Sequence, residues 1–222
     1  MKKILYSVAL AACCMGTMTS CSDFLDASNK SNVTAKQSFA TKEGLNNLVN
    51  DAYQHLQNVY AAPLFTSCFS AGTDMYADAR NKMNEALNTY ETLTPENTDI
   101  KNLYTYLYSG IRAANSVSYY AQTAQVDDKT KSQLIGEARV LAAYEYYLLV
   151  NNFGGVPIMK DFLTTADTGY PKSSPEDVYA YIISELEDVI SKNVLQASTA
   201  TKGGGRISQE TAKAILAKTY LS

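Results

Sequence analysis

The sequence of 222 residues contains no tryptophan and one histidine, and both shortages narrow what the protein can do. Without tryptophan, a flat aromatic surface that stacks on a ligand has to be built mainly from the 17 tyrosines. We interpret the single histidine, His55, as a partly exposed helical residue rather than a metal ligand. The sequence therefore predicts no metal site and no cofactor.

Sequence motifs of common enzymes are absent as well. The chain has no Gly-x-Ser-x-Gly elbow, no paired-glycine dinucleotide fingerprint and no EF-hand loop. The run Gly203-Gly204-Gly205 is not followed by Lys and Ser or Thr, so it is not a phosphate-binding loop. We predict that the protein is not an enzyme, although two carboxylates brought together by folding would leave no motif. The formal net charge of −3 argues against nucleic-acid binding.

Residues 1–20 have the organisation of a secretory signal. Lys2 and Lys3 precede an apolar run over residues 4–16, and small polar residues fill positions 17–20. The run is too short to span a bilayer, and no later stretch reaches the length of a transmembrane helix. Cys21 follows at once and resembles the cysteine of a bacterial lipobox, which is acylated and becomes the new N-terminus. An ordinary signal peptide with a chance cysteine is the alternative.

Cysteine usage excludes a disulfide-stapled scaffold. Cys13 and Cys14 leave with the signal, and lipid would occupy Cys21, so Cys68 would be the one free thiol. Cys68 lies between aromatic residues in the sequence, and we interpret it as a buried structural thiol.

Five amphipathic segments predict an all-α fold with irregular loops and few or no strands. Apolar residues recur at helical spacing over residues 45–60, 100–111, 134–150, 178–190 and 212–220. Thr41, Ser174 and Ser208 are expected caps, and Thr94-Pro95-Glu96 is expected to begin the second helix. The third segment, over residues 131–153, is apolar almost all round, which predicts a helix buried between others and ended by Gly154.

Two of these segments carry a similar pattern of small, large and aromatic residues. The offsets 0, +3 and +8 are shared by Ala138, Leu141 and Tyr146 and by Ala212, Ile215 and Tyr220. Such packing between paired helices is typical of tetratricopeptide-like repeats. The last segment reaches the end of the chain without a stop signal.

Most tyrosines lie on the apolar stripes and are expected in the core, but four fall off them: Tyr76, Tyr90, Tyr106 and Tyr170. Around one of these, Asp74, Tyr76 and Arg80 combine a ring, a carboxylate and a guanidinium. Rings pack on the C–H faces of sugars while charged groups bond their hydroxyls, so these three residues are candidate ligand-binding residues. A solvated turn without a ligand is the alternative.

An ordered set of motifs resembles the SusD/RagB family. The set comprises Cys21-Ser22-Asp23-Phe24-Leu25-Asp26, Tyr104 to Asn115, Gly136-Glu137-Ala138-Arg139-Val140-Leu141, Asn152-Phe153-Gly154-Gly155-Val156-Pro157, Glu176-Asp177-Val178-Tyr179 and Gly205-Arg206-Ile207-Ser208. Three positions depart from the family pattern: Tyr104 replaces a tryptophan, Ala142 stands where arginine is common, and Glu185 replaces an aspartate.

The resemblance implies a lipoprotein of Bacteroidota, held on the outer membrane by a lipid on Cys21 and facing the cell exterior. Such proteins are built from tetratricopeptide-like helix pairs, act as a lid on a SusC-like TonB-dependent transporter, and capture glycans, or in some members peptides, without cleaving them. The implied organisation is a lipoprotein signal peptide at 1–20, a lipid-anchored tether at 21–37, and a SusD-like N-terminal helical domain at 38–222 that is incomplete at its C-terminus. From the helix pairs alone, a tetratricopeptide-like scaffold that binds peptides remains the alternative.

Overall fold

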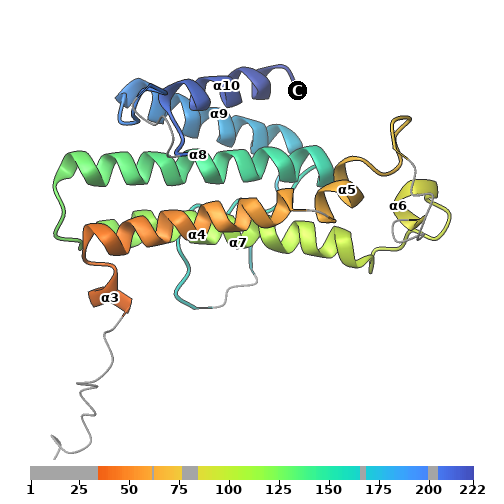
Figure 1. The fold of residues 1–222 in the computed structure, drawn as a ribbon, viewed down its shortest axis with the longest axis horizontal. Helices are drawn as coiled ribbons and strands as arrows, with labels where there is room; N and C mark the ends of the chain where they lie inside the picture. Colours follow the sequence, from red (N-terminus) through yellow and green to blue (C-terminus); the bar gives the residue numbers. More distant parts are fainter. Residues whose placement is uncertain (1–34, 62, 77–84, 166–168, 200–204) are drawn as a thin grey trace, which may run out of the picture. The chain divides into compact units, whose positions relative to one another are not determined.

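The computed structural model describes residues 35–61, 63–76, 85–165, 169–199 and 205–222 (Figure 1). Cys21 and Arg80 lie outside these residues. Within them the chain forms helices and no strand, with one isolated bridge between Thr73 and Tyr76. The all-α prediction is therefore confirmed.

Five long helices and three short ones make up the described chain. The long helices are α4 (Lys42–Tyr60), α7 (Thr98–Ala121), α8 (Asp128–Phe153), α9 (Pro175–Lys192) and α10 (Gln209–Tyr220). The short ones are α3 (Ala35–Ser38), α5 (Leu64–Phe69) and α6 (Glu85–Thr89), which the apolar periodicity did not predict. Residues 35–37, placed in the tether above, belong to α3.

Three predicted caps are present. The side chains of Thr41, Ser174 and Ser208 each accept a hydrogen bond from a backbone N–H in the first turn of the helix that follows. Helix α8 ends at its predicted glycine: Gly154 follows the last helical residue and has a φ of 68°, a backbone conformation that favours glycine.

The predicted start of the second long helix is wrong. Thr94-Pro95-Glu96 forms a turn, in which the N–H of Asn97 donates to the carbonyl of Thr94 at 3.1 Å. Asn97 is the cap, because its side-chain oxygen accepts from the N–H groups of Asp99 and Ile100. The turn satisfies the backbone before the helix begins, so the proline precedes α7 instead of lying in its first turn.

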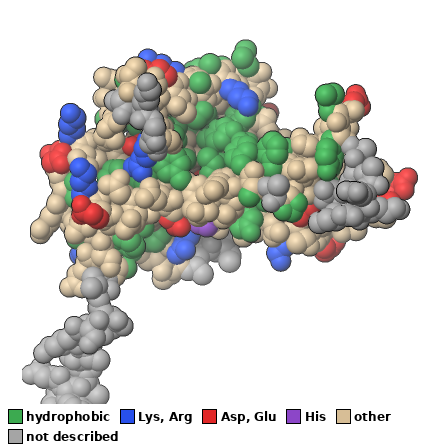
Figure 2. Space-filling model, viewed as in Figure 1, with side chains coloured by type: hydrophobic (Ala, Val, Ile, Leu, Met, Phe, Trp, Pro, Cys, Tyr) green, Lys and Arg blue, Asp and Glu red, His purple; other side chains and the backbone are tan. Residues whose placement is uncertain are grey.

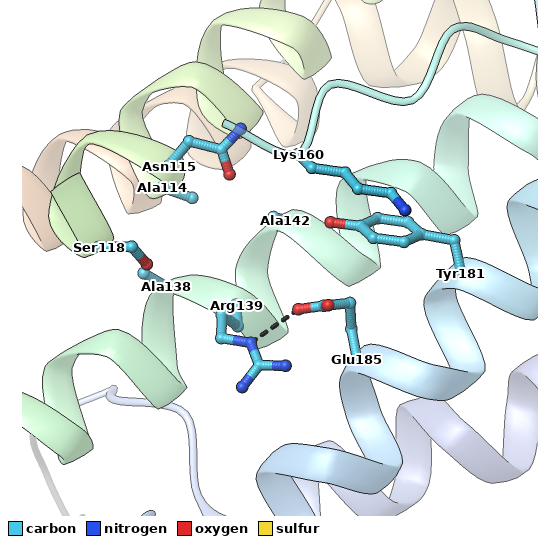
Figure 3. Close-up of a pocket in the computed structure, with 9 residues that line it drawn as sticks. All are labelled: Ala114, Asn115, Ser118, Ala138, Arg139, Ala142, Lys160, Tyr181 and Glu185. Atoms are coloured by element: carbon cyan, nitrogen blue, oxygen red, sulfur yellow. Dashed lines mark hydrogen bonds and ion pairs between the residues drawn. The ribbon is translucent and has the colours of Figure 1, made fainter. Parts of the chain in front are cut away.

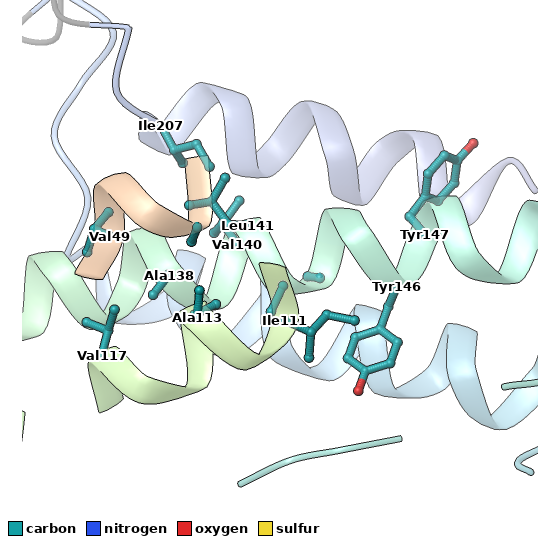
Figure 4. Close-up of a cluster of buried hydrophobic side chains, with 14 of the residues drawn as sticks. Val49, Ile111, Ala113, Val117, Ala138, Val140, Leu141, Tyr146, Tyr147 and Ile207 are labelled. Carbon is teal, nitrogen blue, oxygen red and sulfur yellow. The ribbon is translucent and has the colours of Figure 1, made fainter. Parts of the chain in front are cut away.

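Helix α8 is the centre of the packing (Figure 1). Helices α4 and α7 lie on one side of it and α9 on the other, and α10 packs mainly on α9. The pairs α7/α8 and α9/α10 run antiparallel as helical hairpins. Figure 4 shows Val49 of α4, Val117 of α7 and Ala138 of α8 in one buried cluster, and all three have no exposed surface. This confirms that the apolar third segment is enclosed by other helices.

Three ion pairs join α8 to neighbouring parts of the described chain. Glu137, 1% exposed, lies 2.7 Å from the Nε of Arg206 in the segment before α10. The guanidinium also donates to Asn46 and Asn50 on α4, so one arginine links three parts of the chain. On the opposite side of α8, Arg139 is bonded to Glu185 and Asp188 of α9.

The surface between α4, α8 and α10 is apolar, and Figure 2 shows hydrophobic side chains gathered there. A groove of about 370 Å³ at this place is lined by residues such as Leu56, Tyr144 and Ile215. Tyr220, expected on the buried face of α10, is instead 58% exposed and donates to Glu187, whereas Thr219 is buried. None of the described helices is long and apolar enough to cross a membrane.

Candidate functional site

The site is organised by an extended segment that follows α8 and lies against both α7 and α8. We call residues 156–162 the strap. The phenol of Tyr108 donates to the carbonyl of Pro157 at 2.7 Å, and the amide nitrogen of Asn115 donates to the carbonyl of Met159 at 2.8 Å. From α8, the phenol oxygen of Tyr146 accepts from the N–H of Met159 at 2.7 Å. These bonds satisfy the polar backbone of a segment that has no partner strand.

A pocket of about 880 Å³ opens between the strap and the outer face of α7, and we call it the α7 pocket. Three tyrosines line it, Tyr104, Tyr108 and Tyr170, together with hydroxyl, amide and charged side chains: Thr105, Ser109, Thr164, Thr165, Asn115, Arg112 and Asp161. Pockets of this size accommodate small organic ligands.

The aromatic part of the α7 pocket is a pair of rings one helical turn apart. The ring centroids of Tyr104 and Tyr108 lie 4.7 Å apart with planes tilted by 44°, and Tyr104 is 36% exposed. Burial, followed by the hydrogen bond with Tyr104, raises the pKa of Tyr108. Its phenol stays protonated and donates to the carbonyl of Pro157, which holds the Tyr108 ring against the strap.

The charged part of the pocket is free to meet a ligand. Arg112 and Asp161 form no ion pair with any described residue, although both line the pocket. The guanidinium of Arg112 lies over the ring of Phe162, 5.4 Å from its centroid. The pocket thus combines aromatic faces with donors and acceptors that can bond hydroxyl groups.

The candidate residues from the sequence lie elsewhere. Asp74 is exposed and Tyr76 half-buried, in a turn closed by the N–H of Tyr76 donating to the carbonyl of Thr73 at 3.3 Å. Neither residue lines the α7 pocket, and Arg80 lies outside the described residues. Asp74 and Tyr76 remain predicted ligand-binding residues.

Sequence reasoning assigned Tyr104 and Tyr108 to the core because both continue the apolar stripe of α7. The polar residues that follow each of them, Thr105 and Ser109, could have shown that this edge of the stripe meets solvent. Tyr170 was recognised as off the stripes, and it lines the pocket. Tyr106, which lies on α7 and was also recognised as off the stripes, is partly buried and packs against the core.

The described residues include no cluster of metal ligands and no cysteine with a lowered pKa. No group of three or more His, Cys, Asp or Glu side chains there could hold a metal ion. His55 is partly exposed and lies 3.8 Å from Asp51, one turn earlier on α4. Burial, together with the charge of Asp99, raises the pKa of Cys68 to about 11, which agrees with a structural thiol.

The architecture and the pocket define a class: a protein of helical hairpins with an open, tyrosine-lined pocket beside a bound loop. Residues 23–221 match the family model SusD-like_3, described as starch-binding associating with outer membrane. The chain belongs to this SusD-like family.

Relatives within the family agree with this assignment. The chain is 29% identical over 134 residues to a SusD-like protein of Bacteroides ovatus, covering 59% of this chain and 24% of the relative. It is 27% identical over 190 residues to a SusD-like protein of Formosa agariphila, covering 83% and 36%. The chain therefore spans well under half the length of the curated relatives it matches.

Solved structures share the fold. Surface glycan-binding protein A from Bacteroides uniformis superposes with a TM-score of 0.69 at 25% identity, covering 81% of this chain and 41% of that one. A laminarin-binding SusD-like protein gives a TM-score of 0.69 at 23% identity, covering 80% and 39%. The tetratricopeptide-like arrangement of helix pairs is thus shared with known members.

Proposed function

We propose that this protein binds a glycan at the cell surface and delivers it to a SusC-like TonB-dependent transporter in the outer membrane. Family membership supports the general class, and the names of two structural relatives refer to glycan and laminarin binding. A lipid on Cys21 would hold the protein on the outer face of the membrane. The proposal includes no catalysis, in keeping with the absence of enzyme motifs from the sequence.

The observation that carries glycan binding is the Tyr104–Tyr108 pair beside unpaired polar groups in the α7 pocket. A sugar ring offers C–H faces to aromatic rings and hydroxyls to polar groups around its edge. The pocket offers both, because the exposed ring of Tyr104 lies about two helical turns from Arg112 and about three from Asn115 on the same helix. The ring of Tyr108 is held by its hydrogen bond to the strap, so it loses little conformational freedom when a ligand binds.

Isothermal calorimetry with starch and laminarin oligosaccharides tests this proposal. Tyr104→Ala is expected to weaken binding by about tenfold, since an aromatic contact contributes ~0.5–1.5 kcal/mol beyond its buried area. Tyr220→Ala removes an exposed tyrosine from α10, outside the pocket, and is expected to leave affinity unchanged. Binding that Tyr104→Ala and Arg112→Ala both leave intact would rule out the α7 pocket.

The predicted residues Tyr76 and Asp74 are tested in the same titrations. If Tyr76→Ala weakens binding while Tyr104→Ala does not, the glycan binds at the turn formed by residues 73–76. Incubation of the protein with each oligosaccharide, followed by a reducing-end assay, tests the absence of cleavage. New reducing ends above the level of a buffer blank would show an enzyme.

The transporter is tested by co-purification from cells in a mild detergent. We expect a SusC-like barrel to accompany the tagged protein, and recovery of the protein without any barrel would contradict delivery to a transporter.

Peptide binding is the second candidate, favoured by the apolar groove between α4, α8 and α10. An amphipathic helical peptide fits such a groove through apolar residues on one face. Calorimetry with peptide and polysaccharide panels separates the two functions. Ile215→Asp would weaken peptide binding, whereas it would leave glycan binding in the α7 pocket unchanged.

A further inference from the structure

A second, smaller pocket lies on the other side of the strap, in the space between α7 and α9 above α8 (Figure 3). Its volume is about 260 Å³. Helix α7 contributes Ala114, Asn115 and Ser118, α8 contributes Ala138, Arg139 and Ala142, α9 contributes Tyr181 and Glu185, and the strap contributes Lys160. We call it the inter-helix pocket.

Small side chains leave the space open. Ala114, Ala138 and Ala142 are buried and line the pocket between the larger polar residues. Ordinary core packing leaves few voids larger than a water molecule, so a space of this volume is unusual. About 260 Å³ is enough room for a ligand of monosaccharide size.

The strap lies between the two pockets and contributes side chains to both. Met159 and Asp161 line the α7 pocket, whereas Lys160 between them lines the inter-helix pocket, as expected for an extended segment whose side chains alternate. Asn115 borders both pockets, and its amide nitrogen is used by the strap carbonyls of Met159 and Asp161. Its Oδ1 is directed into the inter-helix pocket in Figure 3.

Of the two basic side chains that line the pocket, one has ion-pair partners among the described residues and the other has none. Arg139 is neutralised by Glu185 and by Asp188, which also binds Lys192. Lys160 forms no ion pair with any described residue, and its ammonium lies over the Tyr181 ring, 5.6 Å from the centroid. The Lys160 ammonium is therefore a positive charge without an ion-pair partner among the described residues. The carboxylate of the next residue, Asp161, is likewise without one, and it acts on Tyr181 but lines the α7 pocket.

Hydroxyl groups supply the remaining contacts. The hydroxyls of Ser118 and Tyr181 make no hydrogen bond with a described residue, and Figure 3 shows the Tyr181 oxygen directed into the pocket. Burial, and then the charge of Glu185, raises the pKa of Tyr181, so its phenol remains a donor. The pocket thus offers unpaired donors and acceptors around a space of monosaccharide size.

We propose that the inter-helix pocket binds a sugar-sized ligand carrying one anionic group, a carboxylate or a sulfate. The anion lies against the Lys160 ammonium, and ligand hydroxyls bond Ser118, Asn115 and Tyr181. This ligand is either a free acidic monosaccharide or an acidic unit of a longer glycan. The inference does not depend on glycan binding in the α7 pocket.

NMR titration of the ¹⁵N-labelled full chain tests the inference with four probes: sodium glucuronate, glucose, sodium sulfate and a glucuronate-containing oligosaccharide. Glucuronate is expected to shift the amide resonances of Ser118 and Ala142 and to bind about tenfold more tightly than glucose, because a charge-assisted hydrogen bond is about twice as strong as a neutral one. Tighter binding of the oligosaccharide identifies a polymer as the source, and equal binding identifies the free acid.

Three variants locate the ligand. Lys160→Gln keeps a polar side chain, one atom shorter, but removes the charge, so the preference for glucuronate over glucose should disappear. Tyr181→Phe should weaken both sugars, and Ala142→Leu should abolish binding by filling the pocket. Lys101→Gln, an exposed lysine on α7 outside the pocket, is the matched control and should bind like the parent.

Two results would overturn the inference while leaving the proposed function standing. The first is equal affinity for glucuronate and glucose. The second is sulfate binding as tight as that of glucuronate in both the parent and Tyr181→Phe, which would reduce the site to a surface charge. Lys160 is exposed, and Tyr181→Phe keeps the ring that packs against the core, so the test survives if Ala142→Leu fails to fold.

Discussion

The carboxylate of Glu145 on α8 lies directly against the backbone of Gly110 on α7, where a Cβ atom at position 110 would overlap it. Glu145 has no exposed surface, and neither of its oxygens has a hydrogen-bond partner in the structure. Burial raises the pKa of Glu145 well above its ordinary value. The uncharged form of this carboxyl is therefore favoured up to a higher pH in the folded protein than in the unfolded chain.

Glu145→Gln is expected to stabilise the protein at neutral and alkaline pH. In the parent, the unfolded state releases the proton above pH ~4.3 while the folded state retains it, so stability falls by about 1.4 kcal/mol per pH unit until the folded group also ionises. Glutamine has nearly the same shape and does not titrate. Urea unfolding at pH 5 and pH 8 should show a smaller difference in the variant.

Glu91→Gln, at an exposed position, provides the control and should leave the pH dependence unchanged. Gly110→Ala should destabilise the fold at every pH, since its methyl group would displace the Glu145 carboxyl. The same dependence of stability on pH in the parent and in Glu145→Gln would show that burial does not raise the pKa of Glu145.

Arg206→Met is expected to destabilise the protein by about 3–5 kcal/mol, because removing one partner of a buried ion pair leaves Glu137 uncompensated. Glu137 would retain only its weaker bonds to Gln133 and Tyr53. Adding Glu137→Gln to Arg206→Met should recover part of the loss, measured as the midpoint of urea unfolding. Lys213→Met, on exposed α10 surface, should have little effect, and failure of the double variant to recover would exclude a charge effect.

The strap should loosen when its anchors are removed. Asn115→Ala and Tyr108→Phe each remove one side-chain donor to a strap carbonyl, at a cost of about 0.5–1.5 kcal/mol. Hydrogen exchange at the amides of residues 158–162 in the strap should accelerate in both variants, and most in the double variant. Thr105→Ala, whose hydroxyl bonds only within α7, should leave exchange in the strap unchanged. Unchanged exchange in the double variant would show that other contacts hold the strap.

The long helices could be predicted because the sequence signals that specify them are local. Apolar periodicity and side-chain caps such as Thr41 and Ser208 act within one or two turns, and the structure contains them. The error at Thr94-Pro95-Glu96 was also local, since the same residues form either a helix start or a turn. Asn97, which decides between them, lies one residue later.

The α7 pocket could not be predicted, because it depends on where the strap lies. Tyr104 and Tyr108 look like core residues in sequence, and only the strap, about 50 residues later in the chain, shows that their edge lines a pocket. The same holds for Glu145, whose burial follows from the small residue opposite it at position 110. Contacts between distant segments have no periodicity that a single sequence could reveal.

Cys68 should react slowly with thiol reagents. Burial and Asp99 raise its pKa to about 11, so the thiolate that attacks iodoacetamide is scarce at pH 8. Mass spectrometry of the peptide containing Cys68 should show little modification in the folded protein and rapid modification in urea. Cys68 is half-buried in the structure, and equal rates in the folded and unfolded protein would contradict its protection by the fold.

Cys21→Ala should release the protein from the membrane. One acyl chain binds a membrane only marginally, but two or more give stable anchoring at about 0.8 kcal/mol per buried methylene. The apolar leader at residues 4–16 is too short to replace them. In cells fed radioactive palmitate, the variant should lose the label and move to the soluble fraction. Cys68→Ala is the matched control and should keep both label and membrane. A Cys21→Ala protein that stays membrane-bound without label would place the anchor elsewhere in the chain.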